Sequence, residues 1–449
     1  MPDVTSPPAA TVAPARRCAY AVLRRVFERG AYADRALTAE AAELDPRDRA
    51  LAMRLAYGAV QRAGTLDHVI EGLSERPAAQ LDPPLLEALR LGLYELLYLR
   101  GAPDYAVVAD AVELAKTHAR AGHGLVNAVL RRATREGADA LLGALGDDTP
   151  ERAAVKHSHP EWIARLWWQS LGPEQARALM AADNEPLEVA LRANTLVTDA
   201  ATLAAELPVR THLDPAIPEA LVLEEPFDTH GSPLWQSGAF HAQSRAAMLV
   251  ARVLDPLPGE RVLDLCAAPG GKSTHLAALM QGRGEVLAVE RNRRRAGGLV
   301  RTARRLHAAN VRVEVADAEH ERAEGAVFDR VLVDPPCSGL GTLQARADLR
   351  WRVTPAAIEQ MTHTQAQILT AGAAALRPGG MLVYSTCTIS PTENERLIAA
   401  FLDSHTEFEL DDLAGTAGAQ PVAEAPGMLQ TLPHRDRTAG FFIARLRKR

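Results

Sequence analysis

The chain has 449 residues, of which 47% are hydrophobic and 24% charged, and its formal net charge at pH 7 is −6. This size and composition are typical of a folded protein with two or three domains, and no apolar run reaches the roughly 20 residues that a membrane helix needs. The four cysteines lie far apart without a Cys-x-x-Cys pair, which argues against a zinc site or a disulfide framework and favours reduced thiols in the cytoplasm.

The first 137 residues are predicted to form a tail followed by a helical domain. Residues 1–15 contain four prolines but no charged-then-apolar signal pattern, so we expect a loose tail. Between residues 16 and 137, apolar side chains recur at helical spacing, and short Gly, Pro or Asp connections separate the segments. This pattern predicts a compact all-α domain. On periodicity alone, a plain bundle that mediates protein contacts stays possible.

A smaller region connects this domain to the rest of the chain. Residues 138–156 lack sustained periodicity and are predicted to be a linker. Residues 157–233 are predicted to form a small α+β subdomain, with a tryptophan-rich helix and a half-buried strand at residues 189–196. His157 and His159 have no further ligand nearby, so a metal site is not expected there.

From residue 234 to the C-terminus, short apolar runs alternate with helical patterns. This alternation predicts a doubly wound α/β domain with a mostly parallel sheet. Right-handed crossovers place the carboxyl ends of its parallel strands at one edge, where such sheets hold their ligands. The strands are expected at residues 261–267, 285–290, 311–317, 327–334 and 381–387, with a terminal strand at 440–446.

The first of these strands leads into a small-residue turn, Ala267–Gly271, and a helix that starts near Lys272. The turn is not a P-loop, because Cys266 stands where the first glycine is required, and no Gly-x-Gly-x-x-Gly motif occurs. Glu290 ends the next strand about 20 residues beyond the turn, the position expected for a carboxylate that binds ribose hydroxyls. A ligand with a ribose but no pyrophosphate indicates S-adenosylmethionine.

Acids and thiols fall at or near the predicted strand ends, namely Asp264, Glu290, Asp317, Asp334 and Cys387. Two prolines after Asp334 stiffen the loop that presents Cys337. The segment Ser390–Glu393 fits a helix capping box with proline at the first helical position. Cys387 is therefore expected just ahead of a helix N-terminus, whose partial positive charge favours a thiolate.

Three motifs together resemble those of the RNA 5-methylcytosine methyltransferases: Asp264–Lys272, Asp334–Gly339 and Ser385–Thr388. The N-terminal region resembles the NusB-like RNA-binding module in its segments 16–23, 55–58 and 124–132. Together they resemble the bacterial branch of that family called ribosomal RNA small-subunit methyltransferase B. The resemblance implies a Rossmann-like class I methyltransferase domain at 234–449, with a C-terminal antiparallel strand, after an all-α NusB-like domain at 16–137.

The resemblance also implies roles for individual residues. Cys387 is expected to be the nucleophile, Cys337 the helper that frees the product, and Asp334 a carboxylate that serves both the base and the cofactor. The residues expected to bind S-adenosylmethionine are Cys266, Ala267, Ala268, Pro269, Gly270, Gly271, Lys272, Glu290, Asp317 and Asp334. The chain departs from the family at Ala439, often an aspartate, at His241–Ser244, usually a Gln-Asp/Glu segment, and at Glu290, more commonly an aspartate.

The chemistry implied by this resemblance explains why two cysteines are needed. Carbon 5 of cytosine is too weak a nucleophile to take a methyl group directly, but a thiolate that adds to carbon 6 raises the electron density at carbon 5. The expected activity is S-adenosylmethionine-dependent methylation of carbon 5 of cytosine in small-subunit (16S) ribosomal RNA, with the base unstacked and Cys387 bonded to it. Transfer-RNA cytosine methylation and a non-catalytic RNA-binding assembly factor stay open as alternatives.

A basic cluster follows the second predicted strand. The net charge of −6 does not itself indicate RNA binding, but a local basic face is sufficient for it. The cluster is as compatible with a solvated helix face as with phosphate contacts. Its members are Arg291, Arg293, Arg294, Arg295, Arg301, Arg304 and Arg305. No feature of the sequence indicates a membrane, a metal or an oligomeric partner.

Overall fold

The computed structural model describes residues 12–99, 101–186, 188–320, 325, 327–414, 421–422 and 425–449. The chain divides into two compact units. The first comprises the residues up to 185 together with 343–352, and the second comprises 186–342 together with 353–449. Of the predicted N-terminal tail, residues 1–11 lie outside the described residues, and the first helix begins at Pro14.

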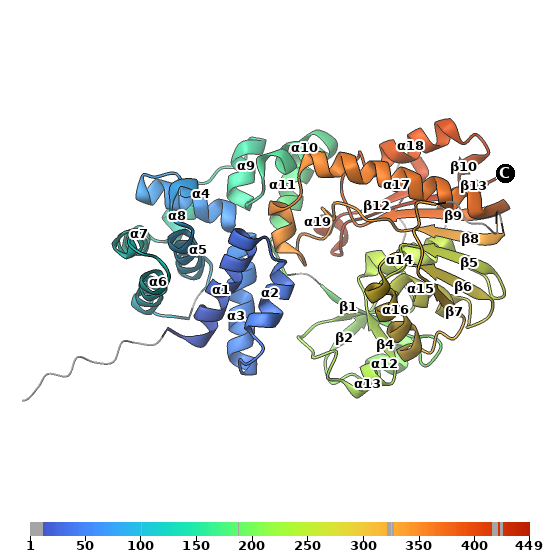
Figure 1. Cartoon of the computed structure of the whole chain (residues 1–449), viewed down its shortest axis with the longest axis horizontal. Helices are drawn as coiled ribbons and strands as arrows, with labels where there is room; N and C mark the ends of the chain where they lie inside the picture. The colour runs from blue at the N-terminus through green and yellow to red at the C-terminus, as the bar shows by residue number, and fades with distance from the viewer. Residues whose placement is uncertain are drawn as a thin grey trace, which may run out of the picture. The chain divides into compact units, whose positions relative to one another are not determined.

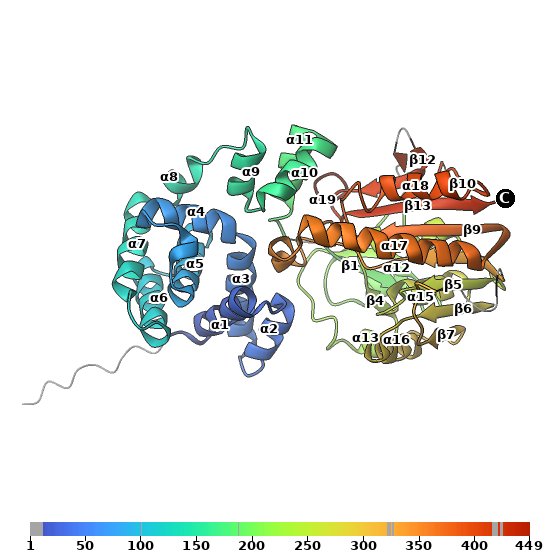
Figure 2. The ribbon, with the colours of Figure 1, turned by 45° about the horizontal axis from the view of Figure 1, so that its top comes forward.

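The first unit is built from helices, as predicted. They are α1 (Pro14–Arg29), α2 (Ala33–Glu40), α3 (Pro46–Gln61), α4 (Ala63–Ser74), α5 (Pro83–Tyr98), α6 (Asp104–His118), α7 (His123–Glu136), α8 (Ala138–Gly143), α9 (Pro150–His157), α10 (Glu161–Leu171) and α11 (Pro173–Ala182), with a 3-10 turn η1 (Ala78–Gln80). Helix α5 contacts α1, α3, α4, α6 and α7, because buried leucines and alanines cover most of its circumference. Figure 2 shows these helices gathered around it.

The predicted linker, residues 138–156, contains the short helices α8 and α9. Their six and eight residues complete too few turns to produce a clear periodic pattern. In α10 the ring of Trp167 is fully buried and meets His159 edge-on, with 5.6 Å between ring centroids. This confirms the aromatic packing that the sequence predicts for that helix.

A segment from the second half of the sequence completes the first unit. Residues 343–352 contain the 3-10 turn η2 (Ala347–Trp351), and the side chain of Arg350 is fully buried. Its guanidinium donates to the carbonyl oxygen of Ser158 at 2.9 Å, to Asn184 Oδ1 at 3.0 Å and to the carbonyl oxygen of Asp183 at 3.1 Å. The sequence pattern does not predict that residues 343–352 belong to the first unit.

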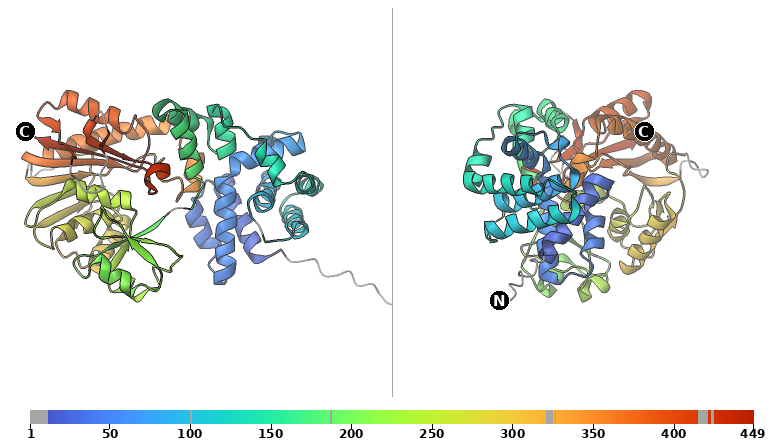
Figure 3. Two further views of the ribbon diagram at one scale, coloured as in Figure 1. Left: turned by 180° about the vertical axis from the view of Figure 1, so that it is seen from behind. Right: turned by 60° about the vertical axis from the view of Figure 1, so that its left-hand side comes forward.

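The smaller sheet of the second unit is antiparallel and has the strand order β2-β3-β1-β4. Its strands are β1 (Val189–Ala193), β2 (Thr211–Leu213), β3 (Ala220–Leu223) and β4 (Phe240–Ala242), accompanied by α12 (Ala200–Glu206) and α13 (Pro233–Gln236). One face packs against α12, as Leu191, Leu203 and Leu221 share a buried cluster. The sheet is seen from behind in Figure 3. It supplies the α+β region that the sequence predicts between the helical and the α/β parts.

The larger sheet has the order β11-β12-β13-β9-β8-β5-β6-β7, with β10 beside β13. The strands β5 to β9 pair in parallel, whereas β13 is antiparallel to β9. This confirms the mostly parallel sheet with an antiparallel C-terminal strand, although β10, β11 and β12 were not predicted. The strands are β5 (Arg261–Leu265), β6 (Glu285–Val289), β7 (Val311–Glu314), β8 (Phe328–Val333), β9 (Leu376–Thr386), β10 (Phe408–Leu410), β11 (Pro421–Val422), β12 (Ala425–Thr431) and β13 (Phe441–Lys448).

Helices cover both faces of this sheet (Figure 1). They are α14 (Arg245–Leu254), α15 (Gly271–Leu279), α16 (Arg293–Arg305), α17 (Pro355–Ala375), α18 (Glu395–Ser404) and, near the C-terminus, α19 (Pro433–Asp436). Neighbouring side chains of a strand point to opposite faces, so Val262 joins the core of α14 and α15, while Leu263 joins that of α17 and α18. Among the residues that the structure describes, no helix is long and apolar enough to cross a membrane.

Candidate active site

The turn after β5 is shaped by two left-handed backbone positions. Cys266 has φ 64° and Gly270 has φ 103°, a conformation that residues with a side chain rarely adopt. Ala267 and Ala268 are buried against Leu299 of α16, which holds the turn close to the sheet. Burial raises the pKa of Cys266 to about 12, so this thiol keeps its proton and does not act as a nucleophile.

A buried arginine from the smaller sheet supports the same turn. Arg192 on β1 donates to the carbonyl oxygen of Gly271 at 2.6 Å, to Thr274 Oγ1 at 3.0 Å and to Gln243 Oε1 at 2.7 Å. These bonds fix the first turn of α15 from outside the α/β domain. No local pattern predicts this role, because Gly271 and Thr274 lie about 80 residues further along the chain. Gln243 belongs to the His241–Ser244 departure.

Asp264 lies inside β5 and is fully buried. Its Oδ2 accepts a hydrogen bond from Ser273 Oγ at 2.6 Å, whereas Oδ1 has no hydrogen-bond partner among the described residues. Burial raises the pKa of Asp264 to about 7. An acceptor left unpaired in such a position is costly unless a ligand or a proton satisfies it.

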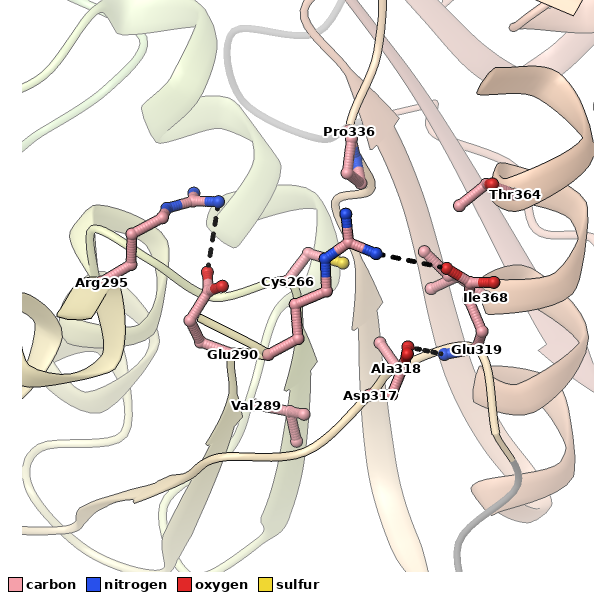
Figure 4. A pocket seen from close by; sticks show the side chains of 11 residues that line it. Cys266, Val289, Glu290, Arg295, Asp317, Ala318, Glu319, Pro336, Thr364 and Ile368 are labelled. Atoms are coloured by element: carbon pink, nitrogen blue, oxygen red, sulfur yellow. Dashed lines mark hydrogen bonds and ion pairs between the residues drawn. The ribbon is translucent and has the colours of Figure 1, made fainter. Parts of the chain in front are cut away.

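A pocket opens beside the turn, at the carboxyl ends of β5 and β6 (Figure 4). Cys266, Glu290 and Asp317 all line it, together with Arg291, Arg295 and the apolar side chains Val289, Ala318, Pro336 and Ile368. Glu290 Oε1 accepts from the backbone N–H of Asn292 at 2.8 Å, and Oε2 lies 3.4 Å from Arg295. A carboxylate beside apolar walls, without a phosphate cradle, fits the ribose and adenine of S-adenosylmethionine.

Lys272 and Asp334 form an ion pair between the turn and the end of β8. The Lys272 Nζ donates to Asp334 Oδ2 at 2.7 Å, and Ser385 Oγ on β9 donates to Asp334 Oδ1 at 3.0 Å. Burial alone would lower the pKa of Lys272, but the adjacent Asp334 carboxylate outweighs it and raises that pKa above its ordinary value. The lysine therefore stays charged and holds Asp334 in one orientation.

The two predicted catalytic cysteines meet at this edge. Cys337, in the loop after β8, and Cys387, directly after β9, have their sulfur atoms 3.2 Å apart. The hydrogen bond with Cys387, and then burial, raise the pKa of Cys337 well above its ordinary value. Cys337 therefore carries its proton while Cys387 lies beside it.

The residues that follow the two cysteines, Ser338 and Thr388, are hydrogen-bonded to each other. Ser338 Oγ lies 2.6 Å from Thr388 Oγ1 and donates to the fully buried carboxylate of Glu393 at 2.5 Å. Glu393 Oε1 accepts from the backbone N–H of Ser338 at 2.8 Å and from Gln365 Nε2 at 3.0 Å. One buried carboxylate thus connects both cysteine loops with α17.

The predicted capping box at Ser390–Glu393 is wrong. Helix α18 begins only at Glu395, and its N-cap Asn394 makes no side-chain capping bond. Glu393 does not reach back to a helix N-terminus, because its oxygens bind Ser338 and Gln365 from other elements. Cys387 is therefore separated from α18 by several residues, and the predicted help from the helix dipole does not apply, since that effect fades within one turn.

Three family models match successive parts of the chain. They describe the NusB family (residues 13–135), a ferredoxin-like domain of RsmF/B-like methyltransferases (159–230) and the 16S rRNA methyltransferase RsmB/F (251–447). A probable ribosomal RNA small subunit methyltransferase B from Synechocystis is 37% identical over 447 residues, covering 97% of this chain and 99% of the relative. The chain belongs to the RsmB/F family of 16S rRNA methyltransferases.

A second relative and a solved structure agree with this assignment. A probable ribosomal RNA small subunit methyltransferase B from Bacillus subtilis is 35% identical and covers 91% of this chain and 92% of the relative. A crystal structure of a methyltransferase homologue from Pyrococcus horikoshii is 30% identical, with a TM-score of 0.59 over 67% of this chain and 99% of that one. As an RsmB/F member, the protein is an S-adenosylmethionine-dependent RNA methyltransferase, which confirms the predicted cofactor and enzyme class.

Two of the three departures from the family, Ala439 and the His241–Ser244 segment, have intramolecular contacts in this RsmB/F member. Ala439 is buried ahead of β13, and its carbonyl oxygen accepts from Thr431 Oγ1 at 2.8 Å. Burial, together with the nearby Arg192 and Arg305, lowers the pKa of His241 to about 3, so His241 is neutral. Within the described ranges, no group of three His, Cys, Asp or Glu side chains is arranged to hold a metal.

Proposed function

We propose that this RsmB/F member methylates cytosine at carbon 5 in small-subunit ribosomal RNA, through a temporary bond between Cys387 and carbon 6. The observation that carries the proposal is the pair of sulfur atoms 3.2 Å apart, from two different loops, at the edge that also holds the Lys272–Asp334 pair. Two thiols so close together can act in turn on neighbouring atoms of one pyrimidine ring. The substrates named for the curated relatives support the choice of RNA.

In this proposal Cys387 begins the reaction. Its thiolate adds to carbon 6 of the cytosine, and the former double-bond electrons become available at carbon 5. Asp334, fixed by Lys272 and Ser385, accepts a hydrogen bond from the exocyclic amino group beside nitrogen 3 and so orients the ring for the addition. When bound, S-adenosylmethionine would supply its sulfonium methyl group to carbon 5, and the electrons of the broken sulfur–methyl bond would remain on the cofactor as a neutral thioether. Glu290 accepts hydrogen bonds from its ribose hydroxyls, and Asp317 lines the same pocket.

Cys337 ends the reaction. Its pKa is raised first by the hydrogen bond with Cys387 and then by burial; joining the Cys387 sulfur to carbon weakens the first cause and leaves the second. Cys337 then releases its proton to water and, as a thiolate, takes the proton from carbon 5. The electrons of that C–H bond restore the carbon 5–carbon 6 double bond, and Cys387 leaves as a thiolate. The two cysteines therefore have different and successive tasks.

Two single substitutions test this assignment. Cys387→Ala should abolish 5-methylcytosine formation, whereas Cys337→Ala should still bond to RNA and accumulate as a complex that survives denaturation. Bisulfite sequencing of ribosomal and transfer RNA, from cells with and without the gene, identifies the methylated RNA. Methylation retained by Cys387→Ala would refute the nucleophile, and a mark found only in transfer RNA would refute the proposed substrate.

A further inference from the structure

The basic cluster after β6 separates into two groups in the structure. Arg291 and Arg295 turn toward the cofactor pocket and pair with the acids Glu319 and Glu290, at 3.5 and 3.4 Å. Arg305 lies over the ring of Trp235, 3.4 Å from its centroid, and donates to that residue's carbonyl oxygen at 2.8 Å. These three arginines have intramolecular partners, and two of them line the pocket.

The other four, Arg293, Arg294, Arg301 and Arg304, are exposed and have no ion pair or side-chain hydrogen bond among the described residues. With about 100° of rotation per residue, they lie within about 100° of each other around α16. The buried residues Ala296, Leu299 and Ala303 occupy the opposite side. The four guanidinium groups therefore form one outward face, which we call the α16 arginine face.

No acidic residue lies within α16, although the whole chain has a net charge of −6. Like charges three or four residues apart destabilise a helix, and Arg301 and Arg304 stand at that spacing. The face is thus a local exception to the acidic character of the chain, and within the described part of the chain no ion pair offsets the repulsion between its arginines. A polyanion would remove that repulsion.

The position of the face suggests which polyanion. Helix α16 starts three residues beyond Glu290, and its Arg295 lines the cofactor pocket. The first turn of α16 therefore lies at the carboxyl edge of the sheet, and the helix runs back from that edge toward the start of β7. From Arg293 to Arg304 the helix rises about 16 Å, which is about the axial length of four or five phosphates in a stacked strand.

We propose that the α16 arginine face binds the phosphates of the RNA strand that flanks the target base. The inference rests on the proposed function for its substrate class. Beyond that function, the inference identifies the surface that binds the RNA strand. Arg291 and Arg295 are not part of this surface, because they line the cofactor pocket. An acidic protein partner is the competing occupant, and the test below separates the two.

The test compares the full-length double variant R301Q/R304Q with R283Q. Arg283 is exposed, precedes β6 and lies outside α16. Binding of a 20-nucleotide single-stranded RNA of mixed sequence is measured by fluorescence anisotropy over a range of KCl concentrations. Each phosphate contact contributes about 0.7 to the slope of log K against log salt for single strands, so R301Q/R304Q should reduce the slope by about 1.4. R283Q should leave it unchanged.

Cofactor binding, measured by calorimetry with S-adenosylmethionine, should be unchanged in R301Q/R304Q, because neither residue lines the pocket. If that variant fails to fold, R293Q/R294Q provides the same measurement from the other end of the face. An unchanged slope, or an equal reduction in R283Q, would overturn the proposal and leave an acidic protein as the candidate occupant. If R301Q/R304Q reduces the salt slope but the wild-type protein makes no 5-methylcytosine, the proposed chemistry is refuted. The proposal that this face binds RNA then still stands.

Discussion

Replacing Glu393 with glutamine tests whether this buried carboxylate sets the distance between the two thiols. Its oxygens accept three hydrogen bonds, from the backbone N–H and the hydroxyl of Ser338 and from Gln365 Nε2. Glutamine keeps the size but loses the charge, and its amide turns one acceptor into a donor that faces another donor. Hydrogen bonds to charged groups contribute about 1.5–3 kcal/mol and neutral ones about 0.5–1.5 kcal/mol. Three weakened bonds therefore amount to about 3 kcal/mol.

At about 1.4 kcal/mol for each factor of ten, this energy corresponds to up to about a 100-fold smaller fraction of enzyme with the sulfurs in place. We expect kcat for RNA methylation in Glu393→Gln to fall by up to that factor. The Kd for S-adenosylmethionine should stay unchanged, because Glu393 does not line the cofactor pocket. Single-turnover methylation with labelled cofactor measures the first quantity, and calorimetry the second. Glu409→Gln, at a half-buried position on β10 whose carboxylate pairs with Arg449, is the matched control.

A purely structural role for Glu393 predicts a different result. The melting temperature would fall while kcat of the remaining folded enzyme stayed near the wild-type value. A variant with kcat within about threefold of wild type would therefore refute the reasoning, whatever its melting temperature.

The remaining predictions concern the cofactor side of the edge. The pKa of Asp264 rises from 3.8 to about 7 on folding, so its protonated form stabilises the fold at low pH, and about 4 kcal/mol is lost as the pH rises from about 4 to about 7. The melting temperature of the cofactor-free protein should fall over that range and level off above it, and Asp264→Asn should flatten that profile; parallel profiles would contradict the burial argument. Glu290→Ala should weaken S-adenosylmethionine binding about 10- to 100-fold by calorimetry, since hydrogen bonds to a charged acceptor are removed. Arg192→Lys should raise KM for the cofactor about tenfold with a smaller effect on kcat, because the lysine cannot hold both Gly271 and Thr274; an unchanged KM would exclude that positioning role.

The strands and their ends were predictable because each is a local pattern. An apolar run followed by an acid or a cysteine marks the carboxyl end of a parallel strand, and handed crossovers bring such ends to one edge. Glu290, Asp317 and Cys266 accordingly line one pocket, and Cys337 meets Cys387. The same rule covers neither β10 nor β12, which are antiparallel additions without a distinct pattern.

The errors came where a distant partner replaces a local one. Ser390–Glu393 has the spacing of a capping box, but Ser338 and Gln365 hold the glutamate instead, and no local rule contains those residues. Arg192 is a similar case, since its function is defined by acceptors that follow it by about 80 residues. The roles of Glu393 and Arg192 depend on hydrogen bonds between residues far apart in the sequence. A periodic pattern of apolar residues carries no information about such bonds.

The inserted segment 343–352 has a consequence for any attempt to divide the protein. A fragment that ends at residue 185 would lack Arg350, and the backbone carbonyls of Ser158 and Asp183 would lose the donor that now occupies them. It would also lose the indole of Trp351, which donates to the carbonyl oxygen of Val60 at 2.7 Å. The first unit therefore cannot be produced complete as an N-terminal fragment. Ten of its residues follow Cys337 in the sequence.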